Sequence, residues 1–275
     1  MPARPLCRLA MAAAMPVALL ACSSSSTSSS LQPAAAAPPR SAGAATTTTS
    51  LITGSLTVFA AASLTSAFND AKASLSAASS GLSLTYSFAG SNALVTQIRQ
   101  GAPADVFASA DQKNMTTLVS AGLVDSPVVF AKNKLEIAVA PGNPKHITGL
   151  ADLARPGVSV VLEAPGVPAG DYTRRVETQL GITITPKSVD PDVKTAITRV
   201  TSGEVDATVV YVTDVHAAGS KVTGVDVPSA QQPAIEYPIA VVKASKNRAA
   251  AQAFVQSAVS GEVQHSLQAQ GFIAP

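Results

Sequence analysis

Apolar residues recur along the chain from residue 51 onward in two alternating patterns. Leu56-Thr-Val-Phe59 is a short apolar run that predicts a strand, and the small residues Ala60-Ala-Ala-Ser63-Leu-Thr follow it. A helix is then predicted over about 65–79, because apolar side chains recur every three or four positions, at Leu64, Phe68, Ala71, Leu75 and Ala78. The segment therefore predicts a strand, a tight turn and a helix.

The same order of elements is repeated at once. Residues 82–88 alternate as a strand should, 89–92 form a second turn of small residues, and 93–100 have helical spacing. Further strands are predicted near 106–109, 135–140, 158–162, 182–189, 206–212, 222–227 and 237–242, and further helices near 112–121, 150–154, 171–180, 193–202, 247–259 and 261–270. Such alternation predicts an α/β fold with mainly parallel sheets flanked by helices.

The first 22 residues have the pattern of a signal peptide. Arg4 and Arg8 precede an apolar stretch, Leu9–Leu20, that is short for a membrane span. The stretch ends in Leu19-Leu20-Ala21-Cys22, which resembles a bacterial lipobox and predicts lipidation of Cys22. A plain signal peptide with an incidental Cys is the alternative. Residues 23–50 are mostly Ser, Thr, Ala and Pro, which predicts a disordered tether.

Charge and cysteine content narrow the classes of function. Removal of the signal peptide takes two of the 19 basic residues, so that the mature chain carries 17 against 17 acidic ones. A neutral chain has no overall field for nucleic acid, so any selectivity for anions must be local. Cys7 leaves with the signal peptide, and Cys22 is the only other cysteine. The mature fold therefore has no disulfide and no site for a bare metal cation built on Cys.

Common catalytic motifs are missing from the sequence. It contains neither a Gly-x-Ser-x-Gly elbow nor a Ser-x-x-Lys, Walker or Gly-x-Gly-x-x-Gly motif. His146, His216 and His265 lie far apart and lack ligand spacing. Asp190 and Asp192 are better interpreted as helix caps than as an acid–base pair. These absences favour a protein that is not an enzyme and has no cofactor.

Four predicted helix starts share small neighbouring residues. Ser63, Ser91, Ala169 and Val193 each lie in or just before a first helical turn. Such turns leave backbone N–H groups open, and in an open α/β sheet helix starts converge beyond the carboxyl ends of the strands. They could hold a dianion without Lys or Arg. Ordinary turns of an α/β fold, in which small residues are common, are the alternative.

Several motifs, in order, resemble those of the periplasmic molybdate-binding proteins of ABC transporters. They run from about residue 55 to Phe272 and comprise Ala60-Ala-Ala-Ser63-Leu-Thr, Phe88-Ala-Gly-Ser91, Gly101-Ala-Pro-Ala-Asp105-Val-Phe, Ala110-Asp-Gln-Lys113, Val167-Pro-Ala169-Gly, Val210-Tyr211 and Glu236-Tyr-Pro238-Ile-Ala-Val-Val. The resemblance implies a two-lobed type II periplasmic-binding-protein fold, hinged by two crossing segments. Lobe I would comprise residues 51–135 plus 236–275, and lobe II residues 136–235.

The resemblance also implies the site and its ligand. Backbone N–H groups of Ser63, Ser91, Ala169 and Val193, with help from the Ser hydroxyls, and the phenol of Tyr211 would bind molybdate, and tungstate as well. The protein would deliver the oxyanion to an ABC transporter permease, as a monomer anchored by lipid at Cys22 on the extracytoplasmic face of the bacterial membrane.

The sequence departs from the pattern of that family at two places. Gly90 stands where some relatives have Ser, and Val212-Thr213 follows Tyr211 where relatives often have Gly-Ser, which could alter the cleft wall.

The same fold could bind another tetrahedral oxyanion such as sulfate, phosphate or thiosulfate. An extracytoplasmic enzyme on this scaffold, or the sensing half of a regulator, are further alternatives that the missing nucleophile and the missing helix-turn-helix disfavour.

Overall fold

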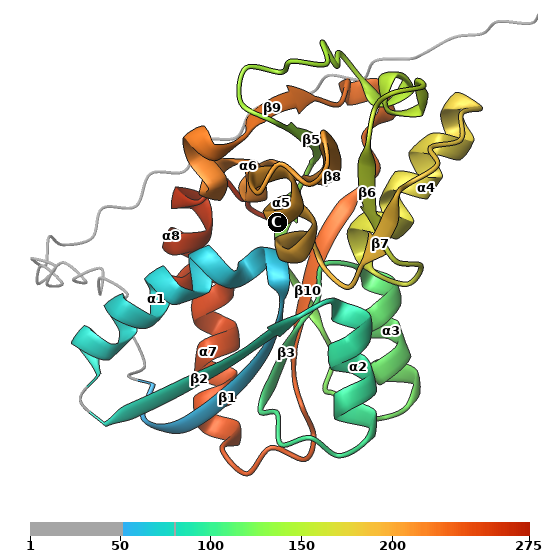
Figure 1. Ribbon diagram of the computed structural model, residues 1–275. Coiled ribbons are helices and arrows are strands. Elements are labelled where there is room, and N and C mark those ends of the chain that lie inside the picture. The colour runs from blue at the N-terminus through green and yellow to red at the C-terminus, as the bar shows by residue number, and fades with distance from the viewer. Residues whose placement is uncertain (1–51, 80) are drawn as a thin grey trace, which may run out of the picture. The chain divides into compact units, whose positions relative to one another are not determined.

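The computed structural model describes residues 52–79 and 81–275, and builds them around two five-stranded sheets (Figure 1). The predicted signal peptide and tether lie outside these residues. In the first sheet the strand order is β2 (Leu82–Ala89), β1 (Gly54–Ala61), β3 (Val106–Ala108), β10 (Ile235–Val241) and β4 (Val128–Asn133). In the second sheet the order is β7 (Ser188–Asp190), β6 (Val160–Glu163), β8 (Ala207–Tyr211), β5 (Leu135–Val139) and β9 (Thr223–Asp226).

Both sheets are mixed, where the sequence predicted mainly parallel pairing. In the first, β1 runs parallel to β2 and β3, but β10 runs antiparallel to β3 and β4. In the second, β6 runs parallel to β7 and β8, but β5 runs antiparallel to β8 and β9. A strand that is buried on both faces reads as one apolar run whichever way its neighbours run. The sequence pattern therefore identified the strands without fixing their direction.

Helices cover both faces of the first sheet, which explains the continuous apolar run of β1. One core contains Val58 together with Phe68 of α1 (Thr65–Ala78) and Phe254 of α7 (Arg248–Ser260), which meet at 5.6 Å between ring centroids. The neighbouring residue Phe59 belongs to the opposite core, which includes Met115. That second core is formed with α2 (Ser91–Arg99) and α3 (Gln112–Ser120), whereas α8 (Glu262–Ala269) packs on α1 and α7.

Three helices accompany the second sheet. They are α4 (Pro168–Leu180), α5 (Val193–Thr201) and α6 (Val212–Ala218). Short 3-10 turns occur at Ala62–Leu64, Leu150–Ala154, Gly219–Lys221 and Ser229–Gln231. The sequence pattern missed β4 and α6, and residues 182–185, predicted as strand, are not in one. The missed helix begins directly after β8, so that its first turn continued the apolar run of the strand.

The chain passes between the two sheets at two places. β4 ends at Asn133 and β5 begins at Leu135, and the return runs from β9 to β10. The side chain of Gln232 joins these passages, because its Oε1 accepts from the Leu135 N–H at 2.8 Å and its Nε2 donates to the Leu135 carbonyl at 2.7 Å. The two passages are thus held side by side where the sheets meet.

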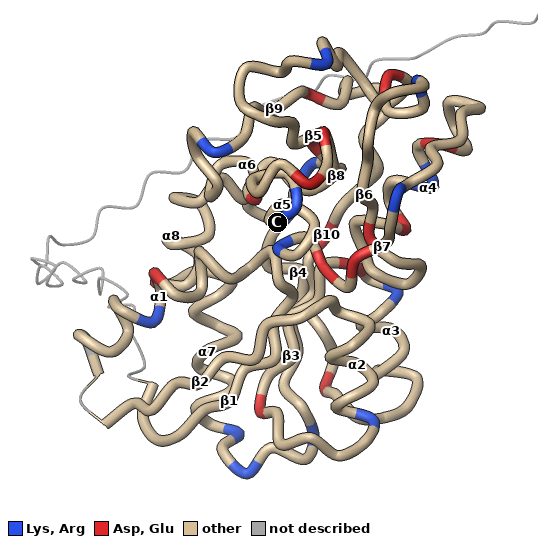
Figure 2. The backbone as a smooth tube through the Cα atoms, viewed as in Figure 1, with Lys and Arg blue, Asp and Glu red and all other residues tan. Residues whose placement is uncertain are grey.

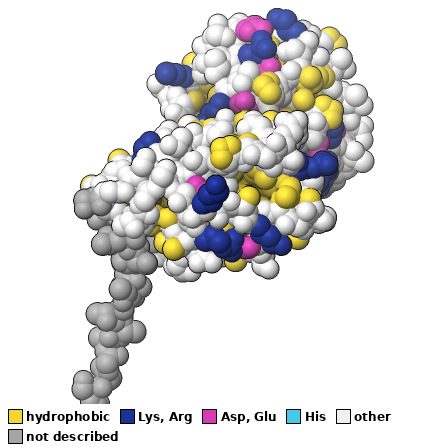
Figure 3. All heavy atoms as spheres, turned by 90° about the horizontal axis from the view of Figure 1, so that it is seen from below, with side chains coloured by type: hydrophobic (Ala, Val, Ile, Leu, Met, Phe, Trp, Pro, Cys, Tyr) yellow, Lys and Arg dark blue, Asp and Glu magenta, His cyan; other side chains and the backbone are white. Residues whose placement is uncertain are grey.

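Charges of both signs are spread over the helices and turns around both sheets (Figure 2). The side of the molecule that is seen from below in Figure 3 carries Lys and Arg side chains next to apolar ones. Within residues 52–79 and 81–275, none of the helices has both the length and the apolar character needed to cross a bilayer.

Candidate functional site

One cavity brings together all five residues that the sequence predicted for the site. It lies between elements of the two sheets. Its lining residues are Ala61, Ala62, Ser63, Gly90, Ser91, Ala110, Val167, Pro168, Ala169, Asp192, Val193 and Tyr211. Nearly all of them are buried. Residues far apart in the sequence therefore converge on one small, enclosed space.

Three helix starts point their open N–H groups toward this cavity. Ser91 and Val193 are the first residues of α2 and α5, and Ala169 is the second residue of α4. N–H groups in a first turn have no acceptor within their own helix. Pro168 has no N–H of its own and begins α4 with its backbone already set for a helix. The positive ends of three helix dipoles thus meet at one place.

Ser63 differs from this arrangement in one detail. It lies in the 3-10 turn Ala62–Leu64 rather than in the first turn of α1, which begins at Thr65. The tighter turn follows β1 directly, and the Thr65 hydroxyl donates to the Ala62 carbonyl at 2.6 Å. The Ser63 N–H still precedes the first complete turn, so that it remains a candidate donor.

Two hydroxyl groups of the site are available as hydrogen-bond donors. The Ser91 Oγ accepts from the Ala110 N–H at 3.1 Å, so its own hydrogen is free to donate elsewhere. The Tyr211 hydroxyl is buried and has no hydrogen-bond partner among the described residues. Burial raises the pKa of Tyr211 well above its usual value, which keeps the phenol protonated. Both groups can therefore act as donors to an anion.

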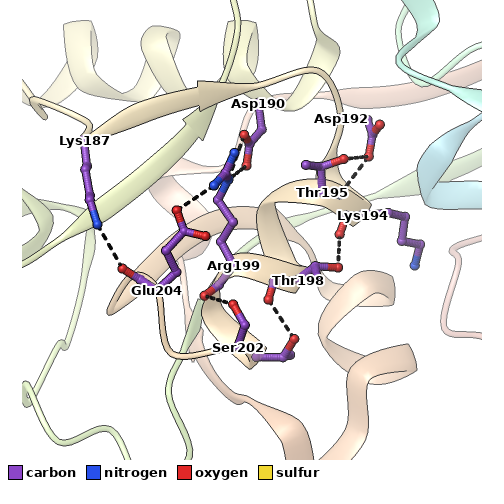
Figure 4. Close-up of polar contacts among 10 residues, drawn as sticks. Lys187, Asp190, Asp192, Lys194, Thr195, Thr198, Arg199, Ser202 and Glu204 are labelled. Atoms are coloured by element: carbon purple, nitrogen blue, oxygen red, sulfur yellow. Dashed lines mark hydrogen bonds and ion pairs between the residues drawn. The ribbon is translucent and has the colours of Figure 1, made fainter.

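Of the described residues that line the cavity, none is Lys or Arg, and the one carboxylate is used as a cap. Asp192 accepts from the Thr195 N–H at 2.9 Å and so caps α5, as the sequence predicted (Figure 4). Asp190, predicted as a cap, instead belongs to β7 and pairs with Arg199 at 2.8 Å. That pairing depends on the tertiary position of α5, which local sequence does not reveal.

The cations nearest to the cavity are paired with acids. Lys194 lies 3.0 Å from the buried carboxylate of Asp214, and Arg199 forms ion pairs with Asp190 and Glu204. These residues line a larger groove that shares Ala62 and Asp192 with the cavity. The groove therefore adjoins the cavity without placing a free cation in it.

Two fully buried carboxyl groups, those of Glu163 and Asp214, lie in the second sheet and the helix after it, outside the lining of the cavity. Glu163, the last residue of β6, is fully buried, and neither of its carboxyl oxygens has a partner in the described part of the chain. Burial raises the pKa of Glu163 to about 8. Burial also raises the pKa of Asp214, although Lys194 opposes the shift. A neutral Glu163 would not repel an anion bound nearby.

Contacts between the two sides of the cavity hold them close together. The Asn114 Nδ2 donates to the Gly166 carbonyl at 3.3 Å. Gly90 lies so near the loop before α5 that a Cβ at this position would be 2.5 Å from the Pro191 carbonyl oxygen. A side chain at position 90 would therefore clash with the backbone of the other side in this arrangement. Val212 and Thr213, the second departure, are not among the lining residues of the cavity.

Tyr237 and Asn133 are polar residues behind the cavity to which the sequence gave no role. The Tyr237 hydroxyl lies 3.0 Å from the Ser63 Oγ, and the Asn133 Nδ2 donates to Tyr237 at 3.5 Å and to the Thr213 Oγ1 at 2.9 Å. All of these residues are buried. In the sequence Tyr237 is part of an apolar strand, and only the contact of its hydroxyl with Ser63 in the fold distinguishes it from other core residues. In the described ranges no group of three or more His, Cys, Asp or Glu could hold a metal ion.

Known proteins resemble this chain over almost all of its described length. The sequence pattern of the family "Bacterial extracellular solute-binding protein" matches residues 56–273. The molybdate-binding protein ModA of Mycobacterium tuberculosis is 42% identical over 222 residues, which are 80% of this chain and 85% of that protein. ModA of Escherichia coli is 33% identical over 205 residues, or 70% of this chain and 79% of that protein.

A solved structure supports the same fold. The periplasmic molybdate-binding protein of Azotobacter vinelandii superposes with a TM-score of 0.69, covering 80% of this chain and 99% of its own, at 22% sequence identity. At that identity the likeness concerns the fold alone. It agrees with a two-lobed type II fold in which two mixed sheets are flanked by helices.

Proposed function

This chain belongs to the bacterial extracellular solute-binding protein family, and from that premise we propose that it binds molybdate, and tungstate as well, for delivery to an ABC transporter permease. The observation that carries the proposal is the cavity. Open N–H groups from three helix starts converge there with the hydroxyl groups of Ser91 and Tyr211, and none of the lining residues is Lys or Arg. Such a donor set suits a tetrahedral dianion, which only accepts hydrogen bonds.

Ser63, Ser91, Ala169, Val193 and Tyr211 are the residues that we assign to the oxyanion. The first four would donate backbone N–H groups, and Tyr211 its phenol hydrogen. Hydrogen bonds to a charged acceptor contribute roughly 1.5–3 kcal/mol each, so several of them give tight binding after the cost of ordering. Burial raises the pKa of Glu163 to about 8, which favours its neutral form at pH 7 and so limits its repulsion of an anion.

Closure around the ligand follows from where the donors lie. We divide the chain into lobe I, residues 51–135 plus 236–275, and lobe II, residues 136–235. Ser63 and Ser91 belong to the first, and Ala169, Val193 and Tyr211 to the second. A dianion that bridges them favours the closed arrangement, because only that arrangement offers all the contacts. The closed, loaded form is the one that the permease would accept.

The remaining parts of the proposal concern the cell. The lipobox-like sequence at Cys22 supports a lipid anchor on the extracytoplasmic face of the bacterial membrane, with the protein acting as a monomer and without enzymatic activity. Replacing Cys22 by Ala should release the protein from the membrane fraction while leaving anion binding intact. Retention of that variant in the membrane fraction would contradict the anchor.

Thermal unfolding with a panel of anions tests the function. A ligand that binds only the native state stabilises it by RT ln(1 + [L]/Kd), so the unfolding temperature rises with the logarithm of the ligand concentration once that concentration exceeds the dissociation constant. We expect molybdate and tungstate to raise it at micromolar concentrations, and sulfate and phosphate to do so much less. A larger shift with sulfate would favour the alternative that the protein serves another tetrahedral oxyanion. No shift with any of the four would overturn oxyanion binding altogether.

A further inference from the structure

A chain of buried hydrogen bonds runs from the passage between the sheets to Ser63. It begins at Asn133, whose amide orientation is set by its neighbours: the Oδ1 accepts from the Lys134 N–H at 2.9 Å. The Nδ2 must then be the donor, to the Thr213 Oγ1 at 2.9 Å and to the Tyr237 hydroxyl oxygen at 3.5 Å. Asn133 therefore uses all its hydrogen-bonding groups in one fixed orientation.

In the next bond, between the Tyr237 hydroxyl and the Ser63 Oγ, either oxygen can be the donor. The Tyr237 oxygen accepts from Asn133, so its own hydrogen is available for the Ser63 Oγ at 3.0 Å. A Ser63 Oγ that accepts from Tyr237 keeps its hydrogen for another acceptor. In the opposite direction Ser63 would give its hydrogen to Tyr237 and would present only lone pairs to the cavity. Lone pairs repel an anion.

We propose that Tyr237, held by Asn133, is a positioning residue that makes the Ser63 hydroxyl a hydrogen-bond donor toward the bound anion. This inference rests on the proposed function, because it assigns a purpose to the hydroxyl of a residue placed in the oxyanion site. It deepens that function by naming residues outside the cavity lining that decide whether Ser63 attracts or repels the ligand.

The surroundings of Tyr237 suit this role. The side chain is fully buried in β10, at the point where the register with β4 shifts between Tyr237 and Pro238. Its ring is held edge-on by three other rings, at centroid distances of 6.4 Å to Phe130, 5.8 Å to Tyr211 and 5.4 Å to Phe272. A ring packed in this way cannot swing its hydroxyl elsewhere. Burial also raises the pKa of Tyr237 well above its usual value, which keeps the hydrogen on the phenol.

Tyr237→Phe is the variant that tests the inference, because it removes the hydroxyl and keeps the ring packing. We expect molybdate affinity, measured by calorimetry, to fall about tenfold, the value of one modest hydrogen bond to a charged acceptor. Tyr86→Phe is the matched control. Its hydroxyl is also buried and lacks a partner among the described residues, but it does not line the cavity, so the control variant should bind as the wild type does.

A double-mutant cycle with Ser63→Ala distinguishes positioning from a general effect on packing. If Tyr237 acts through the Ser63 hydroxyl, Tyr237→Phe should change the affinity of the Ser63→Ala protein by less than about twofold. An equal loss in both backgrounds would overturn the inference, as would an unchanged affinity of Tyr237→Phe alone. Thermal unfolding without ligand verifies that each variant is folded.

The two proposals fail in different ways. Wild-type protein that does not bind molybdate would overturn the proposed function and the positioning role together. Wild-type protein that binds molybdate, with Tyr237→Phe binding equally well, would overturn the positioning role alone and leave the function standing.

Discussion

Lys113 of α3 donates to the carboxylate of Asp171 on α4 at 2.7 Å, so that a helix of the first sheet is joined to a helix of the second next to the cavity. The Asp171 side chain is 19% exposed and that of Lys113 is 63% exposed. Burial would raise the pKa of Asp171, but the hydrogen bonds from Lys113 and from the Gly166 N–H outweigh it and lower that pKa. The pair is positioned to hold the closed arrangement.

Lys113→Ala should speed release of the bound anion by about two- to fivefold, because an exposed ion pair contributes roughly 0.2–1 kcal/mol. Stopped-flow dissociation at low and high salt measures this directly. Salt should reduce the difference between variant and wild type, since it screens the pair. Lys72→Ala, an exposed lysine on α1, is the control. Equal dissociation rates for both variants at low salt would show that the pair does not hold the sheets together.

Tyr211→Phe should weaken molybdate binding by about 1–3 kcal/mol, since it removes a donor to a charged acceptor. The free protein should be no less stable, because the hydroxyl is buried without a partner in the described residues. Calorimetry gives the first value and denaturant unfolding gives the second. A variant that binds normally would remove Tyr211 from the site.

Val193→Pro tests a backbone donor without changing the fold. Proline is favoured at the first position of a helix, and Asp192 before it has the extended backbone that a following proline needs, with φ −165° and ψ 166°. The variant loses the N–H at this position, and the proline ring takes the place of the buried valine side chain. Loss of the N–H should lower the affinity by about 1–3 kcal/mol. Val193→Ala keeps the N–H and should retain most of the affinity. Similar losses in the two variants would mean that side-chain packing matters here, and the N–H does not.

Gly90→Ala should weaken anion binding through a steric clash between the two sides of the cavity. The added Cβ would lie 2.5 Å from the Pro191 carbonyl oxygen, which is backbone and cannot rotate away. The two sides of the cavity must then move apart, and we expect affinity to fall at least about tenfold. Gly149→Ala is the matched control, because nothing lies within 4 Å of the position of its Cβ. Calorimetry measures the molybdate affinity of both variants. Equal affinity of Gly90→Ala and Gly149→Ala would show that the closed arrangement can accommodate the added Cβ.

Glu163→Gln should change how stability depends on pH. The pKa of Glu163 is raised from 4.5 to about 8 in the folded protein, so between these values the unfolded chain loses a proton that the native protein keeps. The free energy of unfolding then falls as pH rises through this range, by at most about 1.4 kcal/mol per pH unit.

A glutamine has no proton to lose, so the variant should gain stability over the wild type as pH rises from 5 to 8 and should match it near pH 4. Denaturant unfolding across this range provides the test, with the exposed Glu262→Gln as control. A constant difference between Glu163→Gln and the wild type would mean that this carboxyl is not held neutral in the fold.

The local sequence pattern was enough to predict most helices and strands of this fold and to identify the small residues at its helix starts. The period of apolar residues identified β1, α1, β2 and α2, and Asp192 caps a helix as predicted. These features depend on neighbours within a few positions, which the sequence displays directly. The choice of Ser63, Ser91, Ala169, Val193 and Tyr211 came from ordered motifs that resemble a known family, and they line one cavity.

Tertiary structure alone decided the relations between distant segments. The antiparallel direction of β10 and β5, the pairing of Asp190 with Arg199 and the approach of Pro191 to Gly90 all depend on how the chain crosses between sheets. The partner of Ser63 is 174 positions away, at Tyr237, so no local pattern could have revealed it. The sequence by itself determined which residues could donate, because helix starts and hydroxyls are local chemistry. Where those donors meet was decided only by the packing of the two sheets, because the residues that line the cavity come from segments far apart in the chain.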